Sequence, residues 1–116
     1  MPTSVVEQLA RAQLKAYNLS DLDAFCACYH QQVQILDEAG EVTIQGLDSF
    51  RERYLDLFNR YQFGATVSQR LVLKQTCVDD ESWWRIDPDT GERSEGRVLV
   101  RYQEQDGKIA LVQFLP

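Results

Sequence analysis

Several features are missing from this sequence, and each absence removes a class of protein. No segment approaches the roughly 20 consecutive apolar residues that a membrane-spanning helix needs. The N-terminus has neither a basic region nor the apolar stretch of a secretion signal, which favours a cytoplasmic location. Lysine and arginine form no cluster, and the formal net charge is −6, opposite in sign to that of a domain that neutralises phosphates. We therefore expect neither a membrane nor a nucleic acid as a partner.

Cysteine and histidine are scarce, with three cysteines and one histidine in the chain. Cys26 and Cys28 are two residues apart in a run with a helical pattern, where their side chains point in different directions. We expect all three cysteines to be reduced. Because no cysteines and histidines stand at the spacing of zinc ligands, the sequence predicts no metal site, and no cofactor is expected.

The length and the order of patterns indicate one domain, 1–116, large enough for a single core and a modest cavity. Residues 4–18, 20–29 and 48–61 have helical periods; Ser4 and Glu7 match a capping box, and Asp48 and Ser49 are expected to cap the third helix. Two β-rich runs, 32–36 and 41–45, flank an acidic turn that ends at Gly40. They predict a short hairpin between the second and third helices.

After residue 64 the pattern changes from helical to alternating. It predicts strands at 67–74, 76–86, 97–103 and 108–115, with turns at 87–91 and 105–107. We expect the last three strands to form an antiparallel meander. Because helices and strands are segregated along the chain, the prediction is an α+β fold in which three helices pack in the concave face of a strongly bent antiparallel sheet.

Three segments, 16–25, 29–46 and 100–114, together resemble the nuclear transport factor 2-like superfamily, in particular its SnoaL-like and ketosteroid-isomerase-like branch. They span nearly the whole chain. The resemblance implies a cone-shaped domain with a pocket for a small hydrophobic molecule, and it implies homodimers. Ketosteroid isomerases of this superfamily use a carboxylate base, with a tyrosine and a protonated aspartic acid forming an oxyanion hole.

Asp37 is the candidate general base that the resemblance indicates. It lies eight residues after Tyr29 and nine before Gly46, which is the spacing of the family's base. Asp37 also begins an acidic turn, where aspartate often accepts hydrogen bonds from backbone amides. Two interpretations therefore stay open, a carboxylate that faces the cavity and a residue that caps the turn.

The oxyanion hole of the resemblance is incomplete in this chain. Its tyrosine position holds Gln13, whose amide is a weaker donor, and Tyr17 lies one helical turn later. Tyr17 is either such a donor or a core tyrosine. The protonated acid would fall at Val98 or Leu99, which are both apolar. Since the loss of one oxyanion donor lowers the rate about 100- to 1,000-fold, steroid isomerisation by this mechanism is not expected.

Aromatic and aliphatic residues on the third helix and the sheet are the candidate pocket wall, although aromatic residues with this spacing also build cores. The expected pocket residues are Phe50, Tyr54, Phe58, Trp84, Leu99, Val112 and Phe114. Trp83 and Trp84 are consecutive in a strand, so their rings point to opposite faces. A tryptophan on the outer face predicts a homodimer through that face. The run 79–81, three consecutive acids, is interpreted as a solvated turn.

Two functions from different classes remain. In the first, it is a non-catalytic binding or assembly domain, whose cavity either binds a small hydrophobic molecule or is only a packing feature. In the second, it is a small isomerase, cyclase or hydrolase that uses Asp37 as general base on a hydrophobic molecule with a carbonyl group. The incomplete oxyanion hole favours the first.

Overall fold

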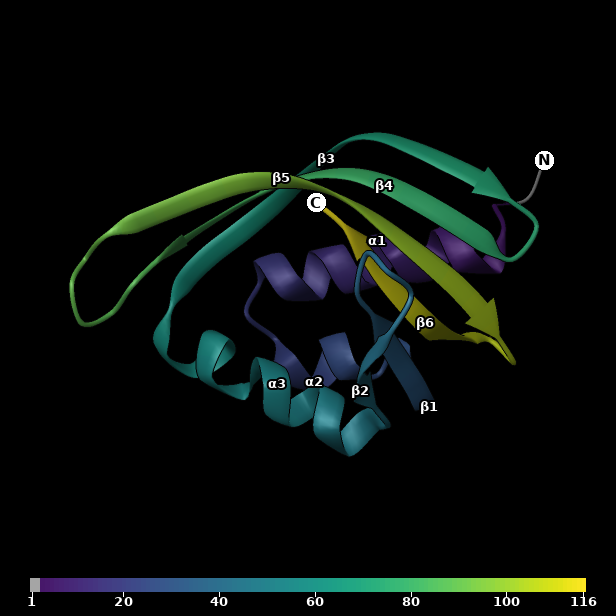
Figure 1. The fold of residues 1–116 in the computed structure, drawn as a ribbon, viewed down its shortest axis with the longest axis horizontal. Helices are drawn as coiled ribbons and strands as arrows, with labels where there is room; N and C mark the ends of the chain where they lie inside the picture. Colours follow the sequence, from purple (N-terminus) through teal and green to yellow (C-terminus); the bar gives the residue numbers. More distant parts are fainter. Residues whose placement is uncertain (1–2) are drawn as a thin grey trace.

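The computed structural model of the chain describes residues 3–116 and has the α+β architecture expected from the sequence, with three helices inside the curve of a six-stranded sheet (Figure 1). The first two residues of the N-terminal stretch considered above lie outside the described part. The elements are α1 (Val5–Asn18), α2 (Leu22–Cys26), β1 (Tyr29–Leu36), β2 (Val42–Gln45), α3 (Leu47–Arg60), β3 (Gln62–Leu73), β4 (Thr76–Ile86), β5 (Arg93–Gln105) and β6 (Lys108–Leu115). Within residues 3–116, no helix is both long and apolar enough to cross a bilayer.

Local signals set two of the three helix starts. The side chains of Ser4 and Asp21 accept hydrogen bonds from backbone N–H groups in the first turns of α1 and α2, as N-caps do. The predicted cap of the third helix is wrong. Helix α3 begins directly after Gly46, whose φ of 91° is the left-handed region, so Asp48 and Ser49 lie inside the first turn.

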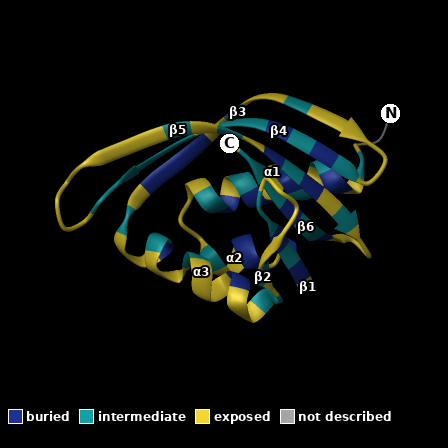
Figure 2. Ribbon diagram, viewed as in Figure 1, coloured by how far each residue is buried: buried dark blue, intermediate teal, exposed yellow. Residues whose placement is uncertain are grey.

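The sheet has the strand order β2-β1-β6-β5-β4-β3. Strands β3 to β6 are joined by tight turns and pair antiparallel, which confirms the predicted meander and extends it by one strand. The expectation of a wholly antiparallel sheet is corrected at one place, because β1 pairs with β6 in parallel. The chain leaves the β1–β2 hairpin through α3 and three more strands before β6 returns beside β1. Figure 2 shows that buried residues gather where the helices meet the sheet and that the hairpin end of β5 is exposed.

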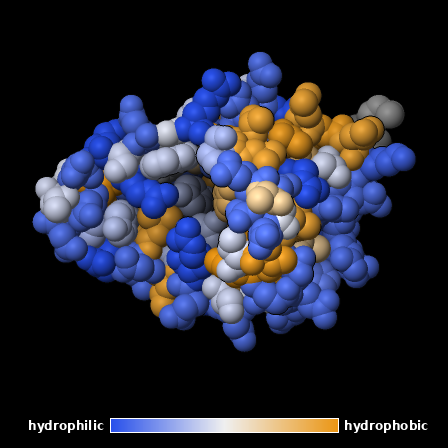
Figure 3. All heavy atoms as spheres, in the orientation of Figure 1, coloured by the Kyte–Doolittle hydropathy of each residue, from blue (hydrophilic) through white to orange (hydrophobic). Residues whose placement is uncertain are grey.

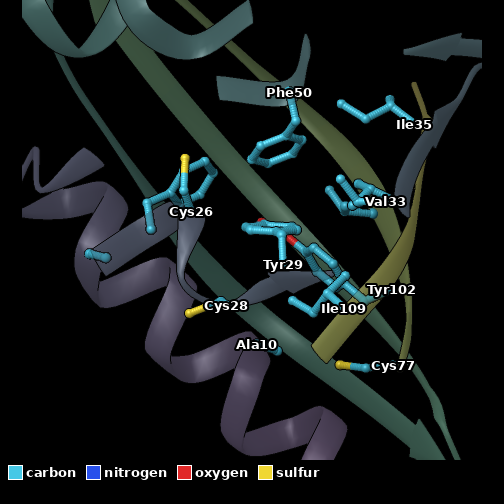
Figure 4. Close-up of a cluster of buried hydrophobic side chains, with 14 of the residues drawn as sticks. Ala10, Cys26, Cys28, Tyr29, Val33, Ile35, Phe50, Cys77, Tyr102 and Ile109 are labelled. Carbon is cyan, nitrogen blue, oxygen red and sulfur yellow. The ribbon is translucent and has the colours of Figure 1, made fainter. Parts of the chain in front are cut away.

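An aromatic cluster forms the core between the helices and the sheet. The ring centroid of Phe25 lies 5.1 Å from those of Tyr29 and Phe58 and 5.6 Å from that of Phe50. Figure 4 shows Tyr29 between Phe50 of α3 and the strand residues Val33 and Ile109, with Tyr102 beside Ile109. The three cysteines are free and buried, in agreement with the expected reduced state. The side chains of the helices and of the concave face of the sheet thus share one core.

Candidate functional site

A cavity of about 350 Å³ lies between the concave face of the sheet and the helices. This volume is within the range of small-molecule sites, about 300 to 1,000 Å³. Aromatic residues form a large part of its wall, namely Tyr17, Phe25, Tyr29, Tyr54, Trp83, Tyr102 and Phe114. Four charged residues line it: Arg53 from α3, Glu81 and Arg85 from β4, and Arg97 from β5. In Figure 3 a hollow with a mainly hydrophilic rim opens between the end of the β4–β5 hairpin and the helices. The cavity is thus more polar than the sequence suggested.

Glu81 is brought into the cavity by the middle of β4. It pairs with Val67 of β3 on one side and Val98 of β5 on the other. The interpretation of residues 79–81 as a solvated turn is therefore wrong, because all three lie inside a central strand. Alternation along the strand places Asp79 and Glu81 on the concave face and Asp80 on the outer face.

The carboxyl group of Glu81 is half-buried, and none of the hydrogen bonds or ion pairs found in residues 3–116 involves it. Loss of water around the group, and next the negative charge of Asp79, raise its pKa to about 7. A carboxyl group with such a pKa both donates and accepts a proton near neutral pH, which is the property that general acid–base catalysis requires.

The two aspartates beside Glu81 are bound by arginines. Asp79, with no exposed surface, accepts two bonds from Arg70 at 2.6 and 2.9 Å. Asp80 accepts two bonds from Arg97 at 2.8 and 2.6 Å on the outer face. Both aspartates are therefore held in structural ion pairs, whereas Glu81 stays available to a ligand.

A tyrosine–glutamine network lies next to the cavity. Tyr29 donates its hydroxyl proton to Oε1 of Gln13 at 3.1 Å, and Nε2 of Gln13 donates to the hydroxyl oxygen of Tyr102 at 3.1 Å and to the carbonyl of Ala10 at 3.1 Å. Both amide protons of Gln13 are thus in use, so Gln13 is held as a support for Tyr102. Tyr102 accepts from Gln13 and donates to no residue within 3–116, which leaves its own proton free for a ligand oxygen. Burial raises the pKa of Tyr102 well above its usual value and keeps that proton in place.

Comparison with known families identifies the chain. The model of the SnoaL-like domain matches residues 10–112. The chain belongs to the SnoaL-like domain family. A comparison of this SnoaL-like domain with curated protein sequences finds no match.

Solved structures with low identity share the fold of this SnoaL-like domain. An uncharacterised cystatin-fold protein from Novosphingobium aromaticivorans superposes with a TM-score of 0.86 at 21% identity, covering 99% of this chain and 100% of the other. A computationally designed 17-OHP binder gives 0.88 at 14%, covering 98% and 94%. The Delta 5-3-ketosteroid isomerase from Mycobacterium sp. gives 0.86 at 13%, also covering 98% and 94%. These similarities confirm the cone-shaped fold that the sequence indicated.

Asp37, the predicted base of this SnoaL-like domain, caps its turn. Its Oδ1 accepts from the backbone N–H groups of Ala39 at 3.0 Å and Glu41 at 2.9 Å, as in the turn interpretation. Asp37 does not line the cavity of Glu81. It lines a second hollow of about 230 Å³, which shares Arg53, Tyr54 and Phe114 with the first.

The predicted pocket residues divide into three groups. Tyr54, Val112 and Phe114 line the cavity, and so does Tyr17, a candidate donor. Phe50 and Phe58 are buried behind the wall, in the core. The expectation for Trp84 and Leu99 is corrected, because neither lines the cavity and both lie on the outer face of the sheet.

Trp83 is the tryptophan that lines the cavity, because it shares its side of the strand with Glu81. Its ring lies over Gly96, the residue that pairs with it on β5. Alternation within 76–86 was visible in the sequence, and it would have grouped Asp79, Glu81 and Trp83 on one face. That signal was missed because three consecutive acids were assigned to a turn. Within residues 3–116, no three histidine, cysteine or acidic side chains are grouped to hold a metal ion.

Proposed function

We propose that this domain binds a small, flat, largely hydrophobic molecule in its cavity and exchanges a proton with it through Glu81. The observation that carries the proposal is an unpaired carboxyl group with a pKa of about 7 in an aromatic cavity. Groups with strongly shifted pKa values in a cleft are candidates for acid–base work. The role that the sequence indicated for Asp37 is here given to Glu81.

Tyr102 supplies the second part of the proposed chemistry. Its free hydroxyl proton would bind a carbonyl or hydroxyl oxygen of the ligand, and a hydrogen bond to such an oxygen stabilises the negative charge that develops when a neighbouring carbon loses a proton. Glu81 is close enough that its negative charge contributes to the raised pKa of Tyr102. The reaction class is therefore an isomerisation or cyclisation in which Glu81 takes a proton from a carbon next to the carbonyl group and the proton is returned to another atom of the same molecule.

The structural neighbours support a ligand of this type. One is a designed binder of 17-OHP and another is a ketosteroid isomerase. A further neighbour, an epoxide hydrolase of Mycobacterium tuberculosis, is an enzyme. A fold that encloses a cavity of this shape is thus compatible with both binding and catalysis.

Asp37 provides a second candidate base, favoured by its place at the second hollow. Only its Oδ1 is used by the turn in the hydrogen bonds of residues 3–116, so Oδ2 could accept a proton from a ligand seated there. A molecule that reaches both hollows would pass Tyr54 and Arg53. This candidate keeps the same ligand class and changes only the base.

Thermal melting and hydrogen exchange test the proposal together. A panel of steroid and aromatic ketones is added to the wild type, Glu81→Gln, Asp37→Asn and Tyr102→Phe. A ligand at a hundred times its dissociation constant should add about 2.7 kcal/mol of stability. Exchange of the protons next to the ketone carbonyl for deuterium is then followed by NMR for each ligand that binds.

We expect Glu81→Gln to keep binding and lose at least 100-fold in exchange rate, and Tyr102→Phe to lose a part of both. Full exchange in Glu81→Gln together with its loss in Asp37→Asn would assign the base to Asp37. Binding without exchange in the wild type would reduce the function to ligand binding.

A further inference from the structure

Arg53 and Arg85 differ from the other arginines of the chain. No hydrogen bond or ion pair found in residues 3–116 involves either side chain, whereas each of the other arginines has an acidic or an amide partner. In a chain of net charge −6, acidic side chains outnumber basic ones. Two arginines with neither an acidic nor an amide partner are therefore unusual here, and both line the cavity.

The two arginines are held by aromatic rings. The guanidinium carbon of Arg85 lies 4.8 Å from the ring centroid of Trp83, and that of Arg53 lies 5.9 Å from the ring centroid of Tyr54. Stacking on a ring orients a guanidinium while its N–H edge stays free to donate. Both aromatic partners are themselves part of the cavity wall.

The arginines and Glu81 act on the same groups inside the cavity. Burial is the largest cause of the raised pKa of Tyr17. The negative charge of Glu81 raises this pKa further, and the positive charges of Arg85 and Arg53 lower it. The same charges act on Tyr54 in the same directions. The charges of Arg53 on α3 and of Glu81 and Arg85 on β4 thus act on the same two tyrosines of the cavity wall.

We propose that the ligand is an amphipathic anion, whose flat hydrophobic body lies against the aromatic wall and whose carboxylate or sulfonate is bound by Arg53 and Arg85. This rests on the proposed binding function and names its ligand class. A planar anionic group matches the paired N–H donors of a guanidinium better than a neutral oxygen does. Glu81, which is protonated in a large fraction of molecules at neutral pH, does not prevent such an anion from entering.

Two fluorescent probes that differ by one anionic group test the proposal. 8-Anilinonaphthalene-1-sulfonate and neutral N-phenyl-1-naphthylamine have the same ring system, and only the first has a sulfonate. Dissociation constants are measured for both at pH 7 and low salt. We expect the anionic probe to bind about tenfold tighter, because an ion pair with an arginine that water can reach contributes modestly. The advantage should decrease with added salt.

Variants locate the effect. Arg53→Gln and Arg85→Gln should each lower the affinity for the anionic probe several-fold and leave the dissociation constant of the neutral probe unchanged. Lys15→Gln removes the same charge from α1 outside the cavity and should leave both constants unchanged. The double variant Leu71→Gln, Leu73→Gln removes exposed apolar surface outside the cavity, and unchanged binding in it assigns the probes to the cavity.

The outcomes separate the two proposals. If both probes bind equally well, or if the arginine variants keep the full advantage, the anionic ligand class is wrong and the binding function stands. If neither probe binds, or if the leucine variants abolish binding, the cavity does not take a ligand of this size and both proposals fail.

Discussion

Glu81 lowers the stability of the folded domain at neutral pH. Its pKa is raised by burial and by the charge of Asp79, and no cation compensates the carboxylate within residues 3–116. When a carboxyl group has a higher pKa in the folded than in the unfolded chain, the free energy of unfolding decreases as the pH rises between the two pKa values. Glu81 therefore destabilises the folded domain, as residues placed for function often do.

The sign of this effect gives the first prediction. Between pH 4.5 and about 7 the unfolded chain has lost the Glu81 proton and the folded chain has kept it. The contribution of Glu81 to stability is therefore highest below pH 4.5 and decreases through this window, by about 2 to 3 kcal/mol in total. Glu81→Gln should be more stable than the wild type at pH 8 by about that amount and nearly equal at pH 4.5. Urea unfolding at both pH values measures the difference, and an equal difference at both would contradict it.

The buried pair of Arg70 and Asp79 gives the second prediction. Arg70→Met leaves the carboxylate of Asp79 without its partner in a place with no exposed surface. We expect a loss of about 3 to 5 kcal/mol in the free energy of unfolding.

The ion pair of Asp80 and Arg97 on the outer face of the sheet provides a matched control, because Asp80 follows Asp79 in the sequence. Arg97→Met breaks the similar two-bond pair with Asp80, but the side chain of Arg97 is 74% exposed. Its effect on urea unfolding should be small. Equal losses in the two variants would show that burial does not decide the contribution of these pairs.

At the scale of the strands, two tryptophan–glycine pairs set the shape of β4 and its neighbours. The ring of Trp83 covers Gly96 of β5 on the concave face, and the ring of Trp84 covers Gly64 of β3 on the outer face. A Cβ atom would come within 2.7 Å of Trp83 at position 96 and within 2.8 Å of Trp84 at position 64. Glycine thus lets each ring lie flat on the sheet.

These pairs give the third prediction. Gly96→Ala should push the ring of Trp83 toward the cavity and weaken binding of a cavity ligand, whereas Gly64→Ala should move Trp84 on the outer face and leave binding unchanged. Both should lower the free energy of unfolding, by about 1 to 3 kcal/mol, because a crowded site is strained. Titration of the naphthalene probes together with urea unfolding checks this. A loss of affinity in both variants, or in neither, would contradict it.

Much of the secondary structure could be predicted because its signals are local. Strands β4 and β6 begin and end at the expected residues, and Ser4 caps α1 as its spacing with Glu7 indicated. The start of α3 was misplaced because the chain turns at Gly46, where no side-chain cap forms.

The candidate site could be predicted only in part, because its contacts join distant segments. Gln13 and Tyr102 are 89 residues apart, and no local pattern indicates their bond. Glu81 was missed since its neighbours Asp79 and Asp80 are also acidic, so polarity alone did not tell which side of the strand faces inward. Tyr17, Tyr54, Val112 and Phe114, which the sequence proposed as donor or pocket residues, do line the cavity.

At the scale of the whole molecule, the outer side of the sheet carries exposed apolar residues. Leu71 and Leu73 are 73% and 74% exposed near the β3–β4 turn, and Leu99 is 43% exposed on β5. Figure 3 shows hydrophobic surface in the region of that turn. Clustered apolar surface of this kind is typical of protein–protein contacts.

The homodimer through the outer face stays a prediction, and it is the fourth. Sedimentation equilibrium should give twice the chain mass of 13.4 kDa. Leu99→Glu should shift the equilibrium toward the monomer, because a charge would be buried in the contact. Asn59→Asp, which adds the same charge at an exposed position of α3 away from the outer face of the sheet, is the control for net charge. A monomer in the wild type at all concentrations would exclude the dimer.

The raised pKa of Glu81 also means that the empty domain is a mixture of two charge states at neutral pH. A ligand that prefers one state must take up or release a fraction of a proton on binding, and the buffer supplies or absorbs it. The heat of binding measured by calorimetry should then change with the ionisation enthalpy of the buffer. The slope of this dependence gives the number of protons taken up or released on binding. That number identifies the charge state of Glu81 that a ligand selects, whether or not any reaction follows.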